Sequence, residues 1–173
     1  MRSALLVVDV QEAMDDPRWG RRNNPELLPN LGRLLAAWRE RGWPVVIVAD
    51  DEPNPESPYH PGKPGNAFKA EVAPREGEYV VRKTTGDAFA GTELEEVLRL
   101  EGVGEVVVGG FMTHKCVAAT VRGAAERGWR VAVVVDATAA VGEGELSAEE
   151  VHARALRGME TEARVLMTGE LVG

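Results

Sequence analysis

Six short apolar runs rich in valine are spaced along the whole chain, and segments of helical period lie between them. The runs are nearly continuous rather than alternating with polar residues, which is typical of strands covered on both faces. Strands alternating with helices predict a Rossmann-like α/β fold, with a doubly wound six-stranded parallel sheet and helices on both faces. The expected strands are Ala4–Val10, Pro44–Ala49, Tyr79–Arg82, Glu105–Gly110, Val131–Ala137 and Ala163–Met167.

Four segments between these runs carry apolar residues at helical spacing. The expected helices are Pro25–Arg41, Thr92–Leu100, His114–Arg127 and Ser147–Glu160. Capping-box patterns are expected at Thr92 with Glu95 and at Ser147 with Glu150, and a glycine follows three of the helices. A chain of 173 residues is the size of one ordinary domain, so we expect residues 1–173 to form a single domain.

The formal net charge of −8, with no long basic stripe, argues against nucleic acid as a partner. No run of 18 apolar residues occurs and the N-terminal stretch lacks the features of a signal peptide, so we expect a cytoplasmic protein with no membrane partner. One cysteine excludes an internal disulfide and a multi-cysteine metal site.

Ligands of open parallel sheets bind beyond the carboxyl ends of the strands. An acid, a lysine and a cysteine are therefore expected at one edge of the sheet, together with the glycines that precede the cysteine. The residues that follow the apolar runs are Asp9, Asp50, Asp51, Lys83, Gly109 to Cys116, and Asp136.

Cys116 is expected in the first turn of a helix, where free backbone amides and a nearby cation would lower its pKa and favour the thiolate. The same amides could hold an oxyanion. Taken alone, a lone cysteine is more often a small buried apolar residue. The alternative interpretation of Asp9 is a buried acid whose hydrogen bonds are made within the chain, and that of Lys83 is a surface residue.

Other common sites are absent from the sequence, which has no GxxxxGK[ST], GxGxxG, GxSxG or CxxC motif. His60, His114 and His152 are scattered, and none has an acid at a ligand-like spacing on the same helix. We therefore expect no cofactor and no metal, and we expect His152 at the surface of the last predicted helix.

Several stretches in order along the chain make the sequence similar to the isochorismatase-like cysteine hydrolases, a superfamily that includes nicotinamidases, N-carbamoylsarcosine amidase and isochorismatase. The stretches are LLVVDVQ (Leu5–Gln11), SPYHPGKPGNAF (Ser57–Phe68), VVRKTTGDAFAGTELEEVL (Val80–Leu98), VVVGGFMTHKCVAATVRGAAERG (Val106–Gly128), VVVDATAA (Val133–Ala140) and SAEEVHARAL (Ser147–Leu156). The resemblance covers about Ala4 to Val172.

The resemblance implies that Asp9, Lys83 and Cys116 form the catalytic triad, the same residues that the strand ends bring together. It also implies a cis peptide at Phe111-Met112 and oxyanion donors in the amides of Met112 and Cys116. Flanking residues are candidates for the walls of the substrate pocket. These are Gln11, Met14, Phe68, Phe89, Phe111 and His114.

Two positions depart from the family pattern. Nicotinamidases carry an Asp-x-His metal motif after the second strand, whereas this chain has Asp50-Asp51-Glu52, with His60 at a spacing that does not match. This argues against nicotinamide as substrate and leaves open whether a metal assists near Asp50, Glu52 and His60. Asp87 stands where serine is usual, and we favour a role in capping its loop over selection of a positively charged substrate.

The expected function is hydrolysis of a C–N bond in a small amide or carbamoyl compound through a thioester on Cys116. Asp9 would serve as acid and base, and Lys83 would stabilise the thiolate. The alternatives are enol-ether hydrolysis of the isochorismatase type, and a non-enzymatic thiol sensor or binding protein on the same fold.

The resemblance also implies the strand order 3-2-1-4-5-6, although placing the third strand beside the first would bring Lys83 nearer to Asp9. Relatives assemble as homo-oligomers, so we expect a dimer or a larger assembly as well as a small-molecule substrate. The proline-rich stretch from Asp50 to Pro74 is expected to be a lid or a subunit contact.

Overall fold

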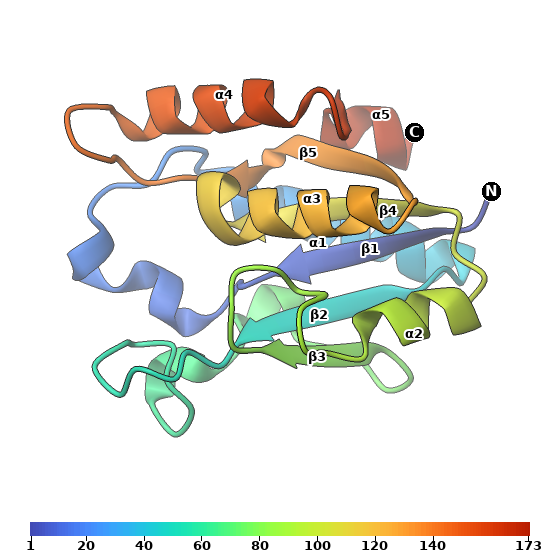
Figure 1. Cartoon of the computed structure of the whole chain (residues 1–173), viewed down its shortest axis with the longest axis horizontal. Coiled ribbons are helices and arrows are strands. Elements are labelled where there is room, and N and C mark those ends of the chain that lie inside the picture. The colour runs from blue at the N-terminus through green and yellow to red at the C-terminus, as the bar shows by residue number, and fades with distance from the viewer.

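Six parallel strands form the centre of the structure, a computed structural model that describes residues 1–173 (Figure 1). Their order is β3-β2-β1-β4-β5-β6, so the implied order is confirmed and the alternative with the third strand beside the first is wrong. The strands are β1 (Ser3–Val8), β2 (Val45–Asp50), β3 (Tyr79–Lys83), β4 (Glu105–Phe111), β5 (Arg130–Ala139) and β6 (Arg164–Leu166).

Helices cover both faces of this sheet, as the near-continuous apolar strands predict (Figure 1). All four expected helices are present within a few residues of their predicted ends, and a short C-terminal helix was not expected. They are α1 (Leu27–Arg41), α2 (Leu94–Leu100), α3 (Ala118–Glu126), α4 (Ala148–Met159) and α5 (Thr168–Val172). No helix combines the length and the apolar character needed to cross a membrane.

The two faces of β1 pack into two separate apolar layers. Leu6 and Val8 lie in the layer beneath α2, α3 and α4, whereas Leu5 and Val7 lie in the layer beneath α1 and α5. Since successive side chains of a strand point to opposite faces, burial of every residue of β1 requires both layers. The central strand is thereby fixed, and with it the position of the residue that follows.

The helix ends confirm one of the two predicted capping boxes. Ser147 and Glu150 form the reciprocal bonds of a capping box at the start of α4. The box predicted at Thr92 is wrong, because the Thr92 hydroxyl donates a 2.5 Å hydrogen bond to the carbonyl of Ala88 and α2 begins one residue later, after Glu93.

The long connection between β2 and β3 is fastened to the end of β1 by Gln11. The buried Gln11 amide donates hydrogen bonds to the carbonyls of Asp50 and Asn66, and its oxygen accepts one from the Asp50 amide at 2.8 Å. A bridge between Gln11 and Phe68 adds to this contact. The connection therefore lies against the carboxyl edge of the sheet.

Gly110 allows β4 to approach β1 at this same edge. Its φ is 130°, a region that favours glycine, and a Cβ atom built on it would lie 2.1 Å from the carbonyl oxygen of Val8. The residues that follow the two strands therefore keep their relative positions only while residue 110 has no side chain.

Replacing Gly110 with alanine should lower the free energy of unfolding by about 3 kcal/mol or more, because the new methyl group must push β1 and β4 apart. Urea denaturation measures the change. Gly32→Ala is the matched control, since Gly32 lies in α1 with open space around it and should gain about 0.5–1 kcal/mol. A Gly110→Ala protein as stable as wild type would contradict the close approach of the two strands.

Candidate active site

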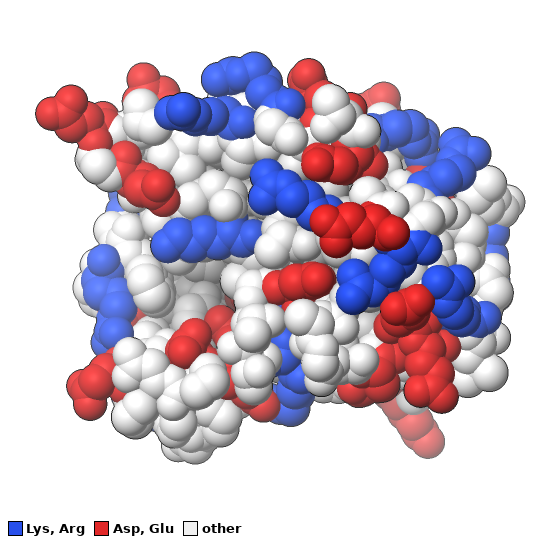
Figure 2. All heavy atoms as spheres, in the orientation of Figure 1, with Lys and Arg blue, Asp and Glu red and all other residues white.

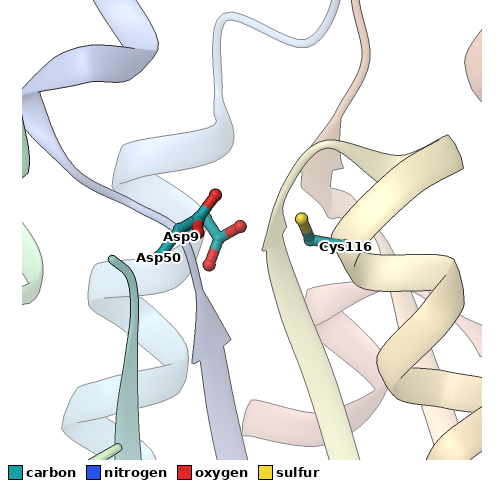
Figure 3. Close-up of side chains that lie close together, drawn as sticks. All are labelled: Asp9, Asp50 and Cys116. Atoms are coloured by element: carbon teal, nitrogen blue, oxygen red, sulfur yellow. The ribbon is translucent and has the colours of Figure 1, made fainter. Parts of the chain in front are cut away.

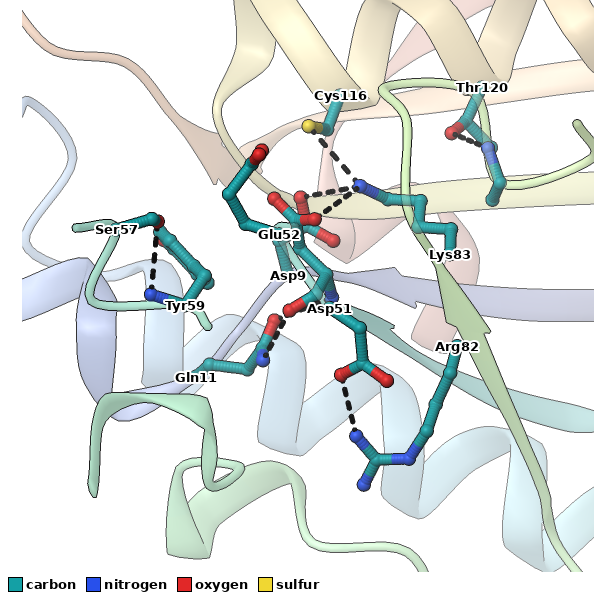
Figure 4. Close-up of polar contacts among 12 residues, drawn as sticks. Asp9, Gln11, Asp51, Glu52, Ser57, Tyr59, Arg82, Lys83, Cys116 and Thr120 are labelled. Atoms are coloured by element: carbon teal, nitrogen blue, oxygen red, sulfur yellow. Dashed lines mark hydrogen bonds and ion pairs between the residues drawn. The ribbon is translucent and has the colours of Figure 1, made fainter. Parts of the chain in front are cut away.

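Asp9, Lys83 and Cys116 meet at the carboxyl edge of the sheet. The Lys83 ammonium donates to Asp9 Oδ2 at 3.1 Å and to Cys116 Sγ at 3.4 Å (Figure 4). Figure 3 shows the carboxylates of Asp9 and Asp50 facing the Cys116 sulfur across a short gap. The strand-end argument and the resemblance thus select three side chains that are in contact.

Lys83 reaches Asp9 although a whole strand separates them. Lys83 ends β3 in register with Asp50 of β2, and its ammonium lies 3.9 Å from Asp50 Oδ1. Neighbouring strands are about 4.8 Å apart, so about 9.6 Å separates β3 from β1. The four-carbon stem of lysine, the Asp9 side chain and the hydrogen bond between them together cover this distance. The side chain is fully buried, so the ammonium is held among the two carboxylates and the thiol.

Asp9 directly follows β1 with a left-handed φ of 57°, a conformation uncommon for a residue other than glycine. Its amide donates to the carbonyl of Val48, which holds the turn against β2. One carboxylate oxygen is bound to Lys83, whereas the buried Oδ1 has no hydrogen-bond partner. Asp9, Asp50 and Cys116 bring an acceptor atom each within 4.8 Å of one another, so the free oxygen of Asp9 is available to take a proton from the thiol.

Cys116 lies in a single π-helical turn, Thr113–Val117, that precedes α3 rather than in the first α-helical turn that we expected. The Met112 carbonyl accepts hydrogen bonds from the amides of Lys115 and Val117, on either side of Cys116. The Phe111-Met112 peptide is cis, as the resemblance implies.

The same turn is anchored to α4 by a buried hydrogen bond of 2.8 Å between the Thr113 hydroxyl and His152 Nδ1. The expectation that His152 lies at the surface is therefore wrong. His152 is on the face of α4 that packs against the turn, and its position in the sequence gave no sign of this contact.

The charges of this cluster are set by burial and by mutual contact. Burial raises the pKa of the Cys116 thiol, and the Asp9 carboxylate raises it further, while Lys83 offsets only part of the effect. Burial also raises the pKa of Asp9. For Lys83, burial alone would lower the pKa, but the charges of Asp9, Cys116 and Asp50 raise it overall. The expectation of a lowered thiol pKa is wrong, because burial and the Asp9 carboxylate outweigh the effect of Lys83.

A cavity of about 200 Å³ opens beside the cluster. Phe111 lines it, as expected, and so do residues that we had not assigned to the pocket. The further lining residues are Trp19, Asp50, Glu52, Ser57, Tyr59, Met112 and Lys115. Ser57 and Tyr59 belong to one of the stretches that carry the resemblance, which was the available signal, whereas nothing in the sequence pointed to Trp19.

Four other residues expected in the pocket walls lie elsewhere. Gln11 fastens the β2–β3 connection, and Phe68 packs beneath the Arg82 guanidinium. Phe89 is in the core, where its ring stacks on Trp129 with a centroid distance of 5.7 Å. Met14 is buried beneath α1.

His114, the remaining candidate for the pocket wall, lines a separate groove between α3 and α4 rather than the cavity beside Cys116. Its Nε2 atom is 3.2 Å from a carboxylate oxygen of Glu143.

The carboxylate of Asp87 accepts a hydrogen bond from the Phe89 amide, which agrees with a role of Asp87 in capping its loop.

The residues present do not fit a bound metal. The acceptor atoms that converge belong to Asp9, Asp50 and Cys116, and the Lys83 ammonium lies against all three, so a second cation would be repelled. His60 Nδ1 lies 2.9 Å from the carbonyl oxygen of Glu52 rather than beside these acceptors.

Comparisons with known proteins agree with the fold. Residues 3–170 match the family model of the isochorismatase domain. The Bacillus subtilis isochorismatase family protein YrdC is 40% identical over 82% of this chain and 75% of its own length. A crystal structure of an isochorismatase family member from Chromobacterium violaceum superposes with a TM-score of 0.94 at 41% identity, covering 99% of this chain and 92% of that one.

A doubly wound parallel sheet of this order is the fold of the hydrolases of the isochorismatase family. This chain belongs to the isochorismatase family. A streptothricin hydrolase from Streptomyces noursei is 42% identical over 79% of this chain and 49% of that protein. The Arabidopsis thaliana protein named "Probable inactive nicotinamidase At3g16190" is 30% identical over 80% of this chain and 81% of its own length, so family membership alone does not establish turnover.

Replacing Asp50 with asparagine should change how stability depends on pH. Burial and the Asp9 charge raise the pKa of Asp50 to about 7, from an ordinary value of 3.8. Because the folded-state pKa is the higher one, the stability linked to this group is fully present below pH 3.8 and is lost as the pH rises through about 7.

The free energy of unfolding of Asp50→Asn minus that of wild type should therefore be larger at pH 8 than at pH 4, by on the order of 2–4 kcal/mol. Denaturant unfolding at both pH values measures it. Glu56→Gln, on the exposed part of the same connection, should keep the wild-type dependence. An unchanged difference between Asp50→Asn and wild type at the two pH values would show that the carboxyl group titrates normally.

Proposed function

We propose that this protein hydrolyses a C–N bond of a small amide or carbamoyl compound through a thioester on Cys116. The observation that carries the proposal is the position of one buried ammonium between a carboxylate and a thiol, on the wall of a cavity large enough for a small molecule. A purely structural ion pair would need neither the thiol nor the opening.

Acylation begins with transfer of the thiol proton to the free oxygen of Asp9. The raised pKa of Asp9 makes it a better base near neutral pH than an ordinary aspartate. The sulfur attacks the carbonyl carbon, and the carbonyl oxygen becomes an oxyanion that the amides of Met112 and Cys116 stabilise. Asp9 then returns the proton to the nitrogen, the C–N bond breaks, and ammonia or an amine leaves.

Deacylation repeats these proton transfers with water. Asp9 takes a proton from a water molecule, and the resulting hydroxide attacks the thioester carbonyl. The C–S bond breaks, a carboxylic acid is released, and the proton held by Asp9 returns to the sulfur. Lys83 remains an ammonium throughout and is the fixed counter-charge for whichever partner, carboxylate or thiolate, carries the negative charge.

Two further facts support this reaction over its alternatives. The superfamily that the sequence resembles contains amidases that work through the equivalent cysteine, and the related Streptomyces noursei protein is named as a hydrolase. Enol-ether hydrolysis of the isochorismatase type has no need of a thiol beside the acid, whereas amide hydrolysis uses both.

Replacing Cys116 with alanine should reduce ammonia release from a panel of small primary amides and carbamoyl compounds by about 10³-fold or more, because the nucleophile is lost. Asp9→Asn should reduce it to a similar degree, since the base is lost. Coupled ammonia detection measures turnover, and mass spectrometry of the wild-type protein with a slow substrate should reveal the acyl adduct on Cys116.

Denaturant unfolding of Cys116→Ala provides the control, because the variant should stay folded. Turnover that survives in Cys116→Ala would exclude the thioester route. A wild-type protein that releases ammonia from none of the panel, yet reacts with iodoacetamide at Cys116, would support the thiol sensor or binding protein instead.

A further inference from the structure

The interior of the cavity carries more negative than positive charge. The carboxylates of Asp9, Asp50 and Glu52 line it, and the one cation buried among them is Lys83. Lys83 lies 3.1 Å from Asp9 and 3.9 Å from Asp50, so one ammonium faces two carboxylates, and Glu52 has no cation of its own. The crowding of Asp9, Glu52 and Asp51 adds to the effect of burial in raising the pKa of Asp50 to about 7.

Lys115 is the other cation that lines the cavity, and it stands at the rim. Its residue is exposed, and it also lines the neighbouring groove between α3 and α4. Figure 2 shows that face of the molecule, where basic and acidic side chains are interspersed. Water screens an exposed ammonium far more than a charge inside the cavity, so Lys115 does not neutralise the inner wall.

Glu52 has a carboxylate oxygen free for a ligand. Its Oε1 accepts a hydrogen bond from the amide of Asn54, and its second oxygen makes no hydrogen bond. Figure 4 shows the Glu52 side chain directed toward Cys116. A group held by this carboxylate would therefore lie near the reacting sulfur.

Aromatic rings form another part of the same cavity. Trp19 and Tyr59 lie with ring centroids 6.3 Å apart, and Phe111 lines the cavity with them. Tyr59 is only 6% exposed, and its hydroxyl makes no hydrogen bond within the chain. Tyr59 lines the same cavity as Asp9, Asp50 and Cys116. Burial raises the pKa of the Tyr59 hydroxyl, and the charges of these three groups raise it further. Because Tyr59 lines the cavity, its hydroxyl can donate a hydrogen bond to a ligand bound there.

Aromatic faces beside carboxylates recognise organic cations rather than metal ions. A metal would need several oxygen ligands converging on one point, and Glu52 is not among the residues whose acceptor atoms converge. An ammonium group on a short carbon chain needs only one carboxylate and a ring to lie against.

We propose that the substrate is an amide that also carries an ammonium group, and that Glu52 binds this ammonium while Trp19 and Tyr59 enclose the chain that joins it to the scissile bond. The inference rests on the proposed function, which it extends from amides in general to cationic ones. Glu52 is the residue that determines specificity, and it takes no part in bond making or breaking.

Three small amides of different charge test the proposal, and the first two of them have the same number of non-hydrogen atoms. At neutral pH 3-aminopropanamide is cationic, butanamide is neutral and succinamate is anionic. We expect the wild-type protein to hydrolyse 3-aminopropanamide with a kcat/KM about tenfold above that of butanamide, with succinamate last, in buffer that contains EDTA so that no metal contributes.

Glu52→Gln should remove most of this preference, because glutamine keeps the bond to Asn54 and loses only the charge that would bind the ammonium. Glu56→Gln is the matched control on the same connection and should keep the preference. A wild-type preference for butanamide or succinamate, or a cationic preference that survives in Glu52→Gln, overturns the proposal.

Failure of the proposed function gives a different result. If the wild-type protein hydrolyses none of the three amides, calorimetric titration of Cys116→Ala with the same compounds measures binding without turnover. Tighter binding of 3-aminopropanamide than of butanamide, abolished by adding Glu52→Gln, supports the cation site although the reaction is wrong. Equal binding of the three, or no binding, overturns the cation site as well.

Discussion

The contact of the Lys83 ammonium with Asp9, Asp50 and Cys116 is the interaction on which the rest of the site depends. It joins groups from β3, β2, the end of β1 and the turn before α3. Lys83 and Asp9 are buried, whereas Asp50 and Cys116 are partly exposed to the cavity. Removing one partner of a buried ion pair destabilises the fold by more than the intact pair stabilises it, because the remaining charge is then buried without a partner. The strand order makes a long side chain necessary, since β2 separates Lys83 from Asp9.

Burial also decides how this cluster holds its charge. A thiol with a low pKa would be reactive at all times, whereas burial and the Asp9 carboxylate raise the pKa of Cys116. The cluster keeps one negative charge beside Lys83 whether the proton lies on the sulfur or on Asp9, so moving the proton does not change its net charge. The two groups titrate as a coupled pair. The nucleophile can thus be formed during the reaction without placing a second unpaired charge in a medium of low polarity.

The sequence predicted the parts of this site that depend on topology. Parallel strands bring their carboxyl ends to one edge, so Asp9, Lys83 and Cys116 could be grouped from apolar runs alone. The walls of the cavity depend on side-chain direction, which reverses with every residue of a strand and is not fixed in a loop. Phe89 follows a strand end and yet faces the core, while Trp19 comes from a turn with no apolar period. His152 was misplaced for the same reason, because its partner Thr113 lies on another element.

Glu52 shows how one substitution alters what such an edge can bind. Nicotinamidases have a histidine two residues after the aspartate that ends the second strand, and a neutral imidazole with that aspartate can share a metal ion. Here a carboxylate stands at that position, beside Asp50 and on the wall of the same cavity. The Glu52 carboxylate is not among the acceptors that converge, and Lys83 already contacts Asp9, Asp50 and Cys116. The compensating positive charge must then enter with the ligand, and a flexible organic cation can meet a single carboxylate where a metal ion cannot.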